Sequence, residues 1–294
     1  MVNRKRLSMT LVPYLFIAPI IILLFVFNIL PLLSAFVISG FDVSTTFGEP
    51  KFLGFANFIE IFRDSRFWNS LMVTLKWTVM EVPLQVILAL LLSVALTENN
   101  PLNKMLRGIY FLPIICSATV VGIMWKLILH SNVGYITYIL NLLGLGKINF
   151  MNSPVLTFFV IVFMSLWKAF GISVIIFVSA MQNVPKSLYE AAEMDSAGKI
   201  RRFFSITIPC IAPTLWFIVM TRLISSFQVF DIVYTTTGGG PNFTTETLVT
   251  YVYTRAFEVY RMGYASAVSV CLFIMILIIT IVLYSRMLKQ EKEY

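Results

Sequence analysis

Six long apolar runs constrain the fold of this chain more than any other feature. A helix needs about 20 residues to cross the hydrocarbon core of a bilayer, and every run is at least that long. The runs cover residues 11–38, 69–96, 106–129, 154–180, 208–230 and 264–285. Charged residues make up 12% of the sequence, against roughly 25% in an average soluble domain. We therefore expect an all-α integral membrane protein with six transmembrane helices in one domain over residues 1–294.

The first run is expected to be a retained transmembrane helix rather than a signal peptide. It follows a basic segment containing Arg4, Lys5 and Arg6, but a signal peptide has an apolar core of only about 7 to 15 residues. With six spans, both termini lie on the same side of the membrane. Three prolines inside later runs predict kinked or broken helices. They are Pro83, Pro113 and Pro213.

The distribution of basic residues predicts the side of the membrane on which both termini lie. Twelve Lys and Arg lie on the side of the termini, and six lie on the other side. Because cytoplasmic segments carry the excess of Lys and Arg, we expect both termini and the segment 181–207 to be cytoplasmic. The same rule accounts for the formal charge of +8 without a nucleic-acid partner.

Segment 181–207 is the most highly charged island in the chain, and it separates two apolar runs. It contains Glu190, Ala191 and Ala192, followed by Asp195, Ser196 and Gly198, and then by Ile206, Ile208 and Pro209. Glu-Ala-Ala alone is a good helix-forming tripeptide. The spacing through to Pro209, between two spans, is more specific.

This pattern resembles the EAA loop of permease subunits in binding-protein-dependent ABC importers. The sequence departs from the family pattern at the glycine position, which is Ser196, and at the leucine position, which is Ile208. The resemblance implies a short cytoplasmic coupling helix that docks into a cleft on an ATPase subunit, with Glu190 at the centre of the contact. The implied coupling residues are Glu190, Ala191, Ala192, Asp195, Ser196 and Gly198.

Two later landmarks resemble the carbohydrate branch of these importers. One is the Gly239-Gly240-Pro241 turn, with Phe227, Phe230, Asp231 and Tyr234 before it, and the other is Gly263-Tyr264-Ala265-Ser266-Ala267. The resemblance implies a sugar importer of a bacterial plasma membrane. Its implied partners are a second homologous permease, two ATPase subunits that bind ATP and Mg, an extracytoplasmic solute-binding protein, a saccharide and membrane lipid.

Charged residues inside the apolar runs mark the candidate substrate path, because a charge in mid-membrane costs about 3 kcal/mol or more. Lys126 lies near a span end and can snorkel, while Lys76 and Glu81 fit an ion pair with another helix as well as a ligand contact. Lys168 and Arg222 lie deep. The predicted path residues are Trp167, Lys168, Arg222, Ser225, Ser226 and Asp231.

Two cations in the path favour an acidic cargo, because a carboxylate or phosphate pairs with a guanidinium through two hydrogen bonds. A uronate oligomer, a sialic acid or a glycerol-phosphate-like compound fits this expectation. A neutral oligosaccharide remains open, since a partner permease can neutralise both cations.

No catalytic or metal-binding set is expected in this chain. Cys116, Cys210 and Cys271 have no metal-ligand spacing, and His130 has no Cys, Asp or Glu at ligand spacing. ATP hydrolysis is therefore expected from a separate subunit. An ion-driven secondary transporter is a weaker alternative, because such proteins combine inverted repeats with intramembrane acids and here Glu81 is the one intramembrane acid.

The loop 42–67 is expected to be either a short amphipathic helix on the outer surface or an ordinary packed loop.

Overall fold

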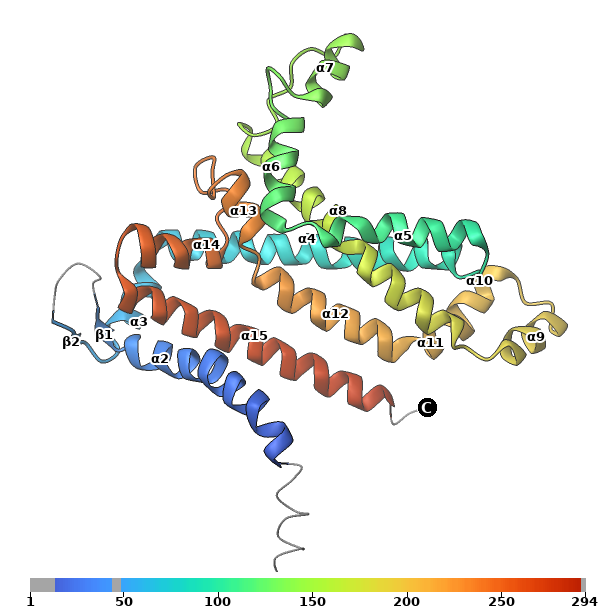
Figure 1. Ribbon diagram of the computed structural model, residues 1–294, viewed down its shortest axis with the longest axis horizontal. Helices are drawn as coiled ribbons and strands as arrows, with labels where there is room; N and C mark the ends of the chain where they lie inside the picture. Colours follow the sequence, from blue (N-terminus) through green and yellow to red (C-terminus); the bar gives the residue numbers. More distant parts are fainter. Residues whose placement is uncertain (1–13, 44–48, 292–294) are drawn as a thin grey trace, which may run out of the picture. The chain divides into compact units, whose positions relative to one another are not determined.

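The computed structural model describes residues 14–43 and 49–291, with side chains to residue 287. Four helices in this part of the chain are long and apolar enough to cross a membrane. They are the helix Tyr14–Ile38, which includes η1 (Phe25–Ile29) and α2 (Leu30–Ile38), then α4 (Ser65–Leu96), α8 (Pro154–Gln182) and the Met262–Met287 part of α15 (Met262–Glu291). The prediction of an all-α membrane fold is confirmed (Figure 1).

Two further apolar stretches are bent pairs of helices rather than straight spans. α5 (Pro101–Ile115) and α6 (Ala118–Ile128) meet at 97°, and the stretch Lys199–Cys210 meets α12 (Ala212–Phe227) at 71°. The latter stretch contains α10 (Lys199–Arg202), the π-helical turn η2 (Phe203–Thr207) and α11 (Ile208–Cys210). Counting each pair as one span gives six. Both bends lie close to a proline at which a kink is expected, whereas α4 continues unbroken through Pro83.

The chain divides into two compact units. Unit 1 comprises Met1–Asp64 and Val252–Phe273, and unit 2 comprises Ser65–Tyr251 and Ile274–Tyr294. The expectation of one domain over residues 1–294 stays a prediction.

Unit 1 holds the short elements between the first two long helices. β1 (Phe41–Asp42) pairs antiparallel with β2 (Lys51–Phe52), and α3 (Ala56–Arg63) follows. The buried Asn57 amide of α3 donates hydrogen bonds to the carbonyls of Ser39 (2.9 Å) and Phe41 (3.0 Å). The carbonyl of Phe41 also lies where a side chain at Gly263 would have to stand, so this position requires glycine.

Ion pairs hold α3 to the start of the last long helix. The guanidinium of Arg261 donates to both carboxylate oxygens of Glu60, at 2.6 and 2.7 Å. This contact lowers the pKa of Glu60 and raises the pKa of Arg261. Asp64 accepts from Arg255 (3.1 Å) and from the hydroxyl of Tyr264 (2.8 Å).

α3 leaves one apolar face exposed. Phe55, Ile59 and Phe62, which are spaced to share that face, are all exposed. The loop 42–67 therefore contains a short amphipathic helix, and its contact with the outer membrane surface stays a prediction.

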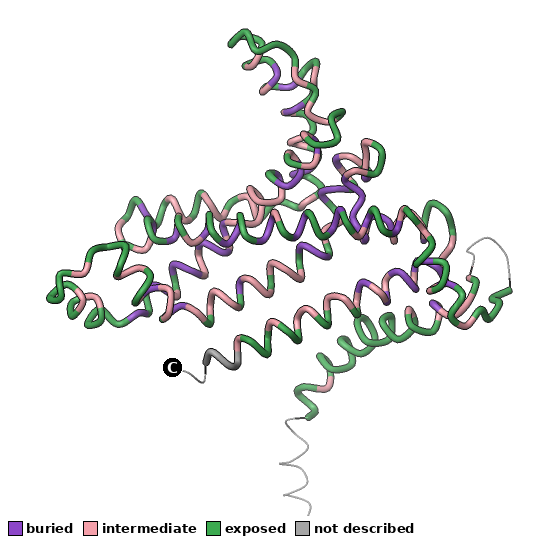
Figure 2. Tube along the Cα trace, turned by 180° about the vertical axis from the view of Figure 1, so that it is seen from behind, coloured by how far each residue is buried: buried purple, intermediate pink, exposed green. Residues whose placement is uncertain are grey.

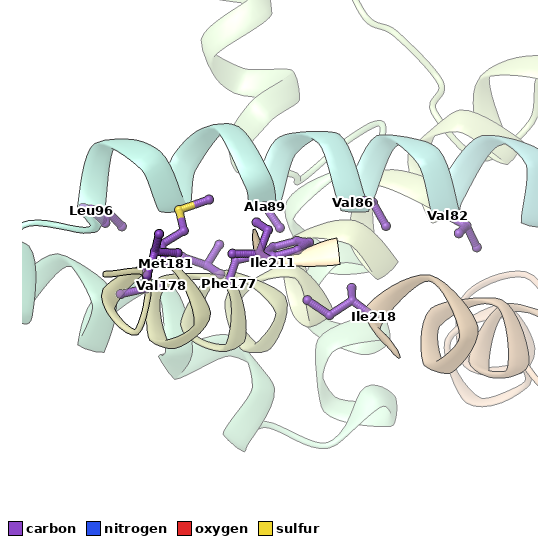
Figure 3. Close-up of a cluster of buried hydrophobic side chains, with 11 residues drawn as sticks. Val82, Val86, Ala89, Leu96, Phe177, Val178, Met181, Ile211 and Ile218 are labelled. Atoms are coloured by element: carbon purple, nitrogen blue, oxygen red, sulfur yellow. The ribbon is translucent and has the colours of Figure 1, made fainter. Parts of the chain in front are cut away.

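Unit 2 has a core in which α8 packs against α4 and α5, and α12 packs against α4. Figure 3 shows the buried cluster at this junction. α4 supplies Val82, Val86, Ala89 and Leu96, and α8 supplies Phe177, Val178 and Met181. Ile218 of α12 and Ile211, directly before α12, complete the labelled residues. α5 and α8 come so close that a Cβ on Gly171 would overlap the carbonyl of Tyr110.

Burial is uneven along the helices. Figure 2 shows buried residues recurring along the helices of unit 2, whereas the helix Tyr14–Ile38 is exposed along nearly all of its length. Such an apolar exposed surface is what a helix in contact with lipid or with another membrane subunit presents.

Candidate functional site

A cavity of about 270 Å³ in unit 2 brings most of the predicted path residues together. It is lined by Lys168 of α8, Arg222 and Ser225 of α12, and Asp231, the first residue of α13 (Asp231–Thr236). Ser165, Gln228 and Phe230 also line it, as do the apolar residues Ile114, Ala118, Ala169, Val229 and Ile232.

The cavity lies where two helical segments are interrupted. α5 ends at Ile115, and α6 starts after Ser117, whose hydroxyl accepts a hydrogen bond from the N–H of Val120 at 3.2 Å. α12 ends at Phe227, and α13 starts at Asp231. Helix ends present backbone groups without helical partners, and within a membrane such backbone is tolerated where it lines a cavity.

Arg222 has an acidic partner that does not itself line the cavity. One of its terminal nitrogens lies 3.4 Å from Oε1 of Glu81 on α4, and the two side chains are 16% and 1% exposed. Of the two uses left open for Glu81, the structure therefore has the ion pair with another helix. Among the described residues, Lys168 forms no ion pair.

Two predicted path residues do not line the cavity. Ser226 is buried against α4, and its hydroxyl donates to Thr78 Oγ1 (3.0 Å) and to the Leu223 carbonyl (2.7 Å). Its neighbour Ser225 faces the cavity because successive helical residues point about 100° apart. Trp167 packs edge to face on Trp125, with ring centroids 5.6 Å apart.

Gln228 also lines the cavity, and its spacing in the sequence could have predicted this. Gln228 lies three residues after Ser225, the spacing that places side chains on one helix face. Ser165 lies three residues before Lys168, so these two side chains also share one helix face. Lys76 lines a second, mostly apolar cavity of about 480 Å³ with Phe158 and Phe159.

The predicted coupling residues lie on and after α9 (Lys186–Met194), in which no residue is buried. Glu190 and Ala191 are exposed and Ala192 is half-buried. The hydroxyl of Tyr189 lies 2.8 Å from that of Thr207, which fastens α9 to η2.

Ser196 occupies a left-handed turn that ends α9. Its φ is +57°, its N–H donates to the carbonyl of Glu193, and the next N–H, of Ala197, donates to that of Ala192, both at 2.9 Å. This pair of bonds is the helix-ending motif that favours glycine at the left-handed position. The departure from the family's glycine therefore leaves this turn in place. Asp195 precedes the turn, and Gly198 has an ordinary φ of −65° at the start of α10.

Large exposed apolar side chains lie on this helix and shortly after it, and the sequence did not predict them. Met194 and Ile200 are 86% and 76% exposed, and Leu188 and Phe204 are also exposed. An exposed apolar patch beside charged residues is typical of a protein interaction surface.

Hydrogen bonds that join Glu246 and Leu248 to α4 hold the end of the segment that follows α13. The buried carboxylate of Glu246 accepts from Arg66 at 2.6 and 2.9 Å and from Ser70 at 3.1 Å. Thr74 accepts a hydrogen bond from the N–H of Leu248 at 2.9 Å. These contacts hold residues 246–248 against α4, and the composition of the segment alone did not indicate them.

No group of three or more His, Cys, Asp or Glu side chains suited to a metal ion occurs among the described residues. Cys116, Cys210 and Cys271 are free thiols. Nδ1 of His130 accepts a hydrogen bond from the N–H of Asn132 at 3.3 Å, which is a local structural role.

Comparison with known proteins gives consistent matches over nearly the whole chain. A family model described as "Binding-protein-dependent transport system inner membrane component" matches residues 53–288. The trehalose/maltose transport system permease protein MalF of Thermococcus litoralis is 34% identical, over 92% of this chain and 91% of that protein. The sulfoquinovosyl glycerol transport system permease protein SmoG of Agrobacterium fabrum is 34% identical, over 96% of this chain and 91% of that protein.

Two further matches extend the comparison. The sn-glycerol-3-phosphate transport system permease protein UgpA of Agrobacterium fabrum is 32% identical, over 92% of each chain. Among solved structures, a chain of a bacterial ABC transporter involved in the import of the acidic polysaccharide alginate matches with a TM-score of 0.83, over 98% of this chain and 99% of that chain. Its sequence identity is 21%, so the likeness shows the fold.

Proposed function

The chain belongs to the family of binding-protein-dependent transport system inner membrane components, and from this premise we propose how its cavity and its coupling helix serve transport. It is a permease subunit of a sugar importer of the ABC type and a multi-pass membrane protein. The observation that carries the proposal is the convergence of Lys168, Arg222, Ser225 and Asp231 on one cavity. These residues come from helices on either side of α9 in the sequence.

In this proposal α9 is the coupling helix, docked on an ATPase subunit through Glu190. Support comes from the absence of buried residues in this helix, from the exposed apolar residues on and after it and from the turn at Ser196, which ends the helix as a glycine would. ATP and Mg bind to two ATPase subunits, which are separate chains. A second permease completes the path, and a solute-binding protein delivers the cargo from the outside. In the same proposal that helix and both termini are cytoplasmic, which the excess of basic residues on the side of α9 supports.

The coupling role is tested with Glu190→Lys in the assembled importer. The reversed charge should leave membrane insertion intact and abolish the dependence of ATP hydrolysis on cargo. Glu98→Lys is the matched control, because Glu98 is an exposed acid just beyond the end of α4. Unchanged cargo-dependent ATP hydrolysis and uptake in Glu190→Lys would contradict the docking role.

For the cargo, the cavity supports a neutral saccharide best. Its walls combine hydroxyl, amide, ammonium and carboxylate groups, which suit sugar hydroxyls. The formal charges also balance, because Lys168 and Arg222 are matched by Asp231 and by Glu81 behind Arg222. An acidic saccharide is the second candidate, favoured because Lys168 has no ion pair among the described residues.

Lys168→Gln distinguishes the two cargo classes. If the cargo is neutral, uptake should fall only moderately, because a glutamine still donates a hydrogen bond. If the cargo carries a carboxylate or phosphate, losing the cation should reduce uptake by on the order of 100-fold, the size of a lost charge-assisted contact. Arg222 is the poorer choice for this test, because its loss would also strand the buried Glu81. Uptake that needs an ion gradient and no ATP would contradict the importer assignment itself.

A further inference from the structure

In the part of the chain that the structure describes, Glu81 is the acid that pairs with Arg222 of the cavity wall, and the importer assignment gives it no role. Its side chain is 1% exposed on α4, and its partner Arg222 lies on α12, 141 residues away in the sequence. Arg222 itself lines the cavity while Glu81 does not. Arg222 therefore both contacts the buried carboxylate and lines the cavity.

The pair is loosely joined for two buried charges. A single contact of 3.4 Å links them, whereas strong guanidinium–carboxylate pairs form two parallel hydrogen bonds at about 2.7–2.9 Å. Oε2 of Glu81 and Nε of Arg222 are buried and have no hydrogen-bond partner among the described residues. A pair built only for stability would satisfy these atoms, because an unsatisfied buried polar atom is costly.

The charge count of the cavity depends on Glu81. With Glu81 present, the two cations Lys168 and Arg222 are matched by two carboxylates, Glu81 and Asp231. Without Glu81 the same walls carry one net positive charge. Because the effective dielectric constant at a partly buried site is lower than that of water, one unit of charge acts more strongly on a ligand there than in bulk water.

We propose that Glu81 is a positioning residue that sets cargo specificity: it holds Arg222 at the cavity wall and cancels its charge, so that the cavity does not favour anionic saccharides. The inference rests on the proposed function, in which this cavity holds the cargo. It assigns to α4, which supplies no residue of the cavity wall, control over which class of saccharide the site accepts.

The test compares a neutral galactose trimer with the galacturonate trimer, which has the same number of rings and carries carboxylates. Binding of each is measured to the assembled importer in lipid nanodiscs without the solute-binding protein, so that its selectivity does not mask that of the membrane subunits. Glu81→Gln keeps the size of the side chain and removes its charge. It should raise the ratio of acidic to neutral affinity on the order of tenfold, as expected for one uncompensated charge in a partly dry site.

Two further variants separate this role from a purely structural one. Arg222→Gln should shift the ratio in the opposite direction, and the double variant should return it close to the wild-type value. The double variant, which strands neither charge of the pair, also carries the test if Glu81→Gln fails to fold. Glu98→Gln, the same change at an exposed acid beyond α4, should leave the ratio unchanged.

The outcomes distinguish the inference from its premise. If the wild-type importer binds at least one trimer but Glu81→Gln leaves the ratio unchanged, or Arg222→Gln shifts it in the same direction as Glu81→Gln, the inference is overturned and the proposed function stands. If Arg222→Gln, which changes the cavity wall itself, alters the affinity for neither trimer that the wild-type importer binds, the assignment of the cavity as the cargo site is overturned, and the inference fails with it.

Discussion

Removing Arg66 should destabilise the protein strongly, because Arg66 is the cation that compensates a buried acid. The Glu246 side chain is 1% exposed and that of Arg66 is 26% exposed. Their two hydrogen bonds are 2.6 and 2.9 Å long, and Ser70 supplies a third at 3.1 Å. The guanidinium also lies 3.9 Å from the centre of the Phe243 ring.

Arg66→Met keeps the apolar stem and leaves the Glu246 carboxylate with Ser70 alone. Breaking a buried ion pair in this way costs about 3–5 kcal/mol, and the lost contact with the Phe243 ring adds about 0.5–1 kcal/mol. Because Arg66 is partly exposed, water can reach the vacated space, so the lower part of this range applies. We expect a loss of about 3–4 kcal/mol in the free energy of unfolding.

Thermal unfolding of the purified protein in detergent measures this loss. At roughly 2–4 °C per kcal/mol, Arg66→Met should lower Tm by about 6–16 °C. The double variant Arg66→Met, Glu246→Gln removes the stranded charge and should recover more than half of that fall. Arg63→Met is the matched control, because Arg63 is exposed, and it should change Tm by about 1 °C.

Two results would refute this reasoning. One is an Arg66→Met variant with the Tm of the Arg63→Met control. The other is a double variant as unstable as Arg66→Met, since the cost would then not come from the uncompensated carboxylate.

Three smaller effects follow from backbone geometry and from a surface ion pair. Ser196→Gly should stabilise the protein by about 1 kcal/mol, because glycine adopts the left-handed φ of +57° without the clash of a Cβ; the measurement is Tm. Gly171→Ala should lower Tm by an amount equivalent to about 1–3 kcal/mol, because the new methyl group would overlap the Tyr110 carbonyl. In Glu60→Gln, the free energy of unfolding should fall less steeply at acidic pH than it does in the wild type. The Arg261 contact lowers the pKa of Glu60 from its ordinary 4.5. The stabilisation by the ion pair is therefore present above that pH and is lost as the pH falls through the folded-state pKa of Glu60. Because Glu60 and Arg261 are 45% and 40% exposed, the effect on the free energy of unfolding should be less than about 1 kcal/mol, measured from unfolding curves.

Matched glycine variants serve as controls for the two backbone predictions. Gly198→Ala and Gly108→Ala place a methyl group where no atom lies within 4 Å, at positions without positive φ, so neither should lower Tm appreciably. A Gly108→Ala variant less stable than Gly171→Ala would contradict the overlap argument, and a lowered Tm in Ser196→Gly would contradict the turn argument. Equal acid dependence in wild type and Glu60→Gln would contradict the assignment of that ion pair.

Much of the fold follows from the sequence because a membrane leaves a long apolar run few choices. Backbone groups in hydrocarbon must bond within their own segment, so the runs 154–180 and 264–285 become the helices Pro154–Gln182 and Met262–Met287, with ends within a few residues of expectation. The bends of 97° and 71° were outside the reach of hydropathy, which sums apolarity along a segment and carries no direction. Pro113 indicated a kink, but not that the next helix would turn through a right angle.

The candidate site was predicted in part, for a similar reason. Depth in a span identified Lys168 and Arg222 as charges that need a polar environment, and the helical period grouped Arg222 with Ser225 and Ser226. The period gives relative directions on one helix, but not which direction faces the cavity, so it did not separate Ser225 from Ser226. The partner of Arg222 lies 141 residues earlier, and a pairing at that separation depends on how α4 and α12 pack.

The way in which the two cavity cations connect to α9 bears on how transport would proceed. Lys168 lies on α8, which runs unbroken to Gln182, about 21 Å along the helix from Lys168 and four residues before α9 begins. Arg222 is connected to the other end of α9 through the 71° bend at Ile211. If α9 docks on the ATPase as proposed, a push on it moves Lys168 together with the rigid α8, whereas the bend lets α12 and Arg222 follow by a different rotation. The two walls of the cavity would then separate or close as α9 moves, which is the coupled change in access that an importer needs.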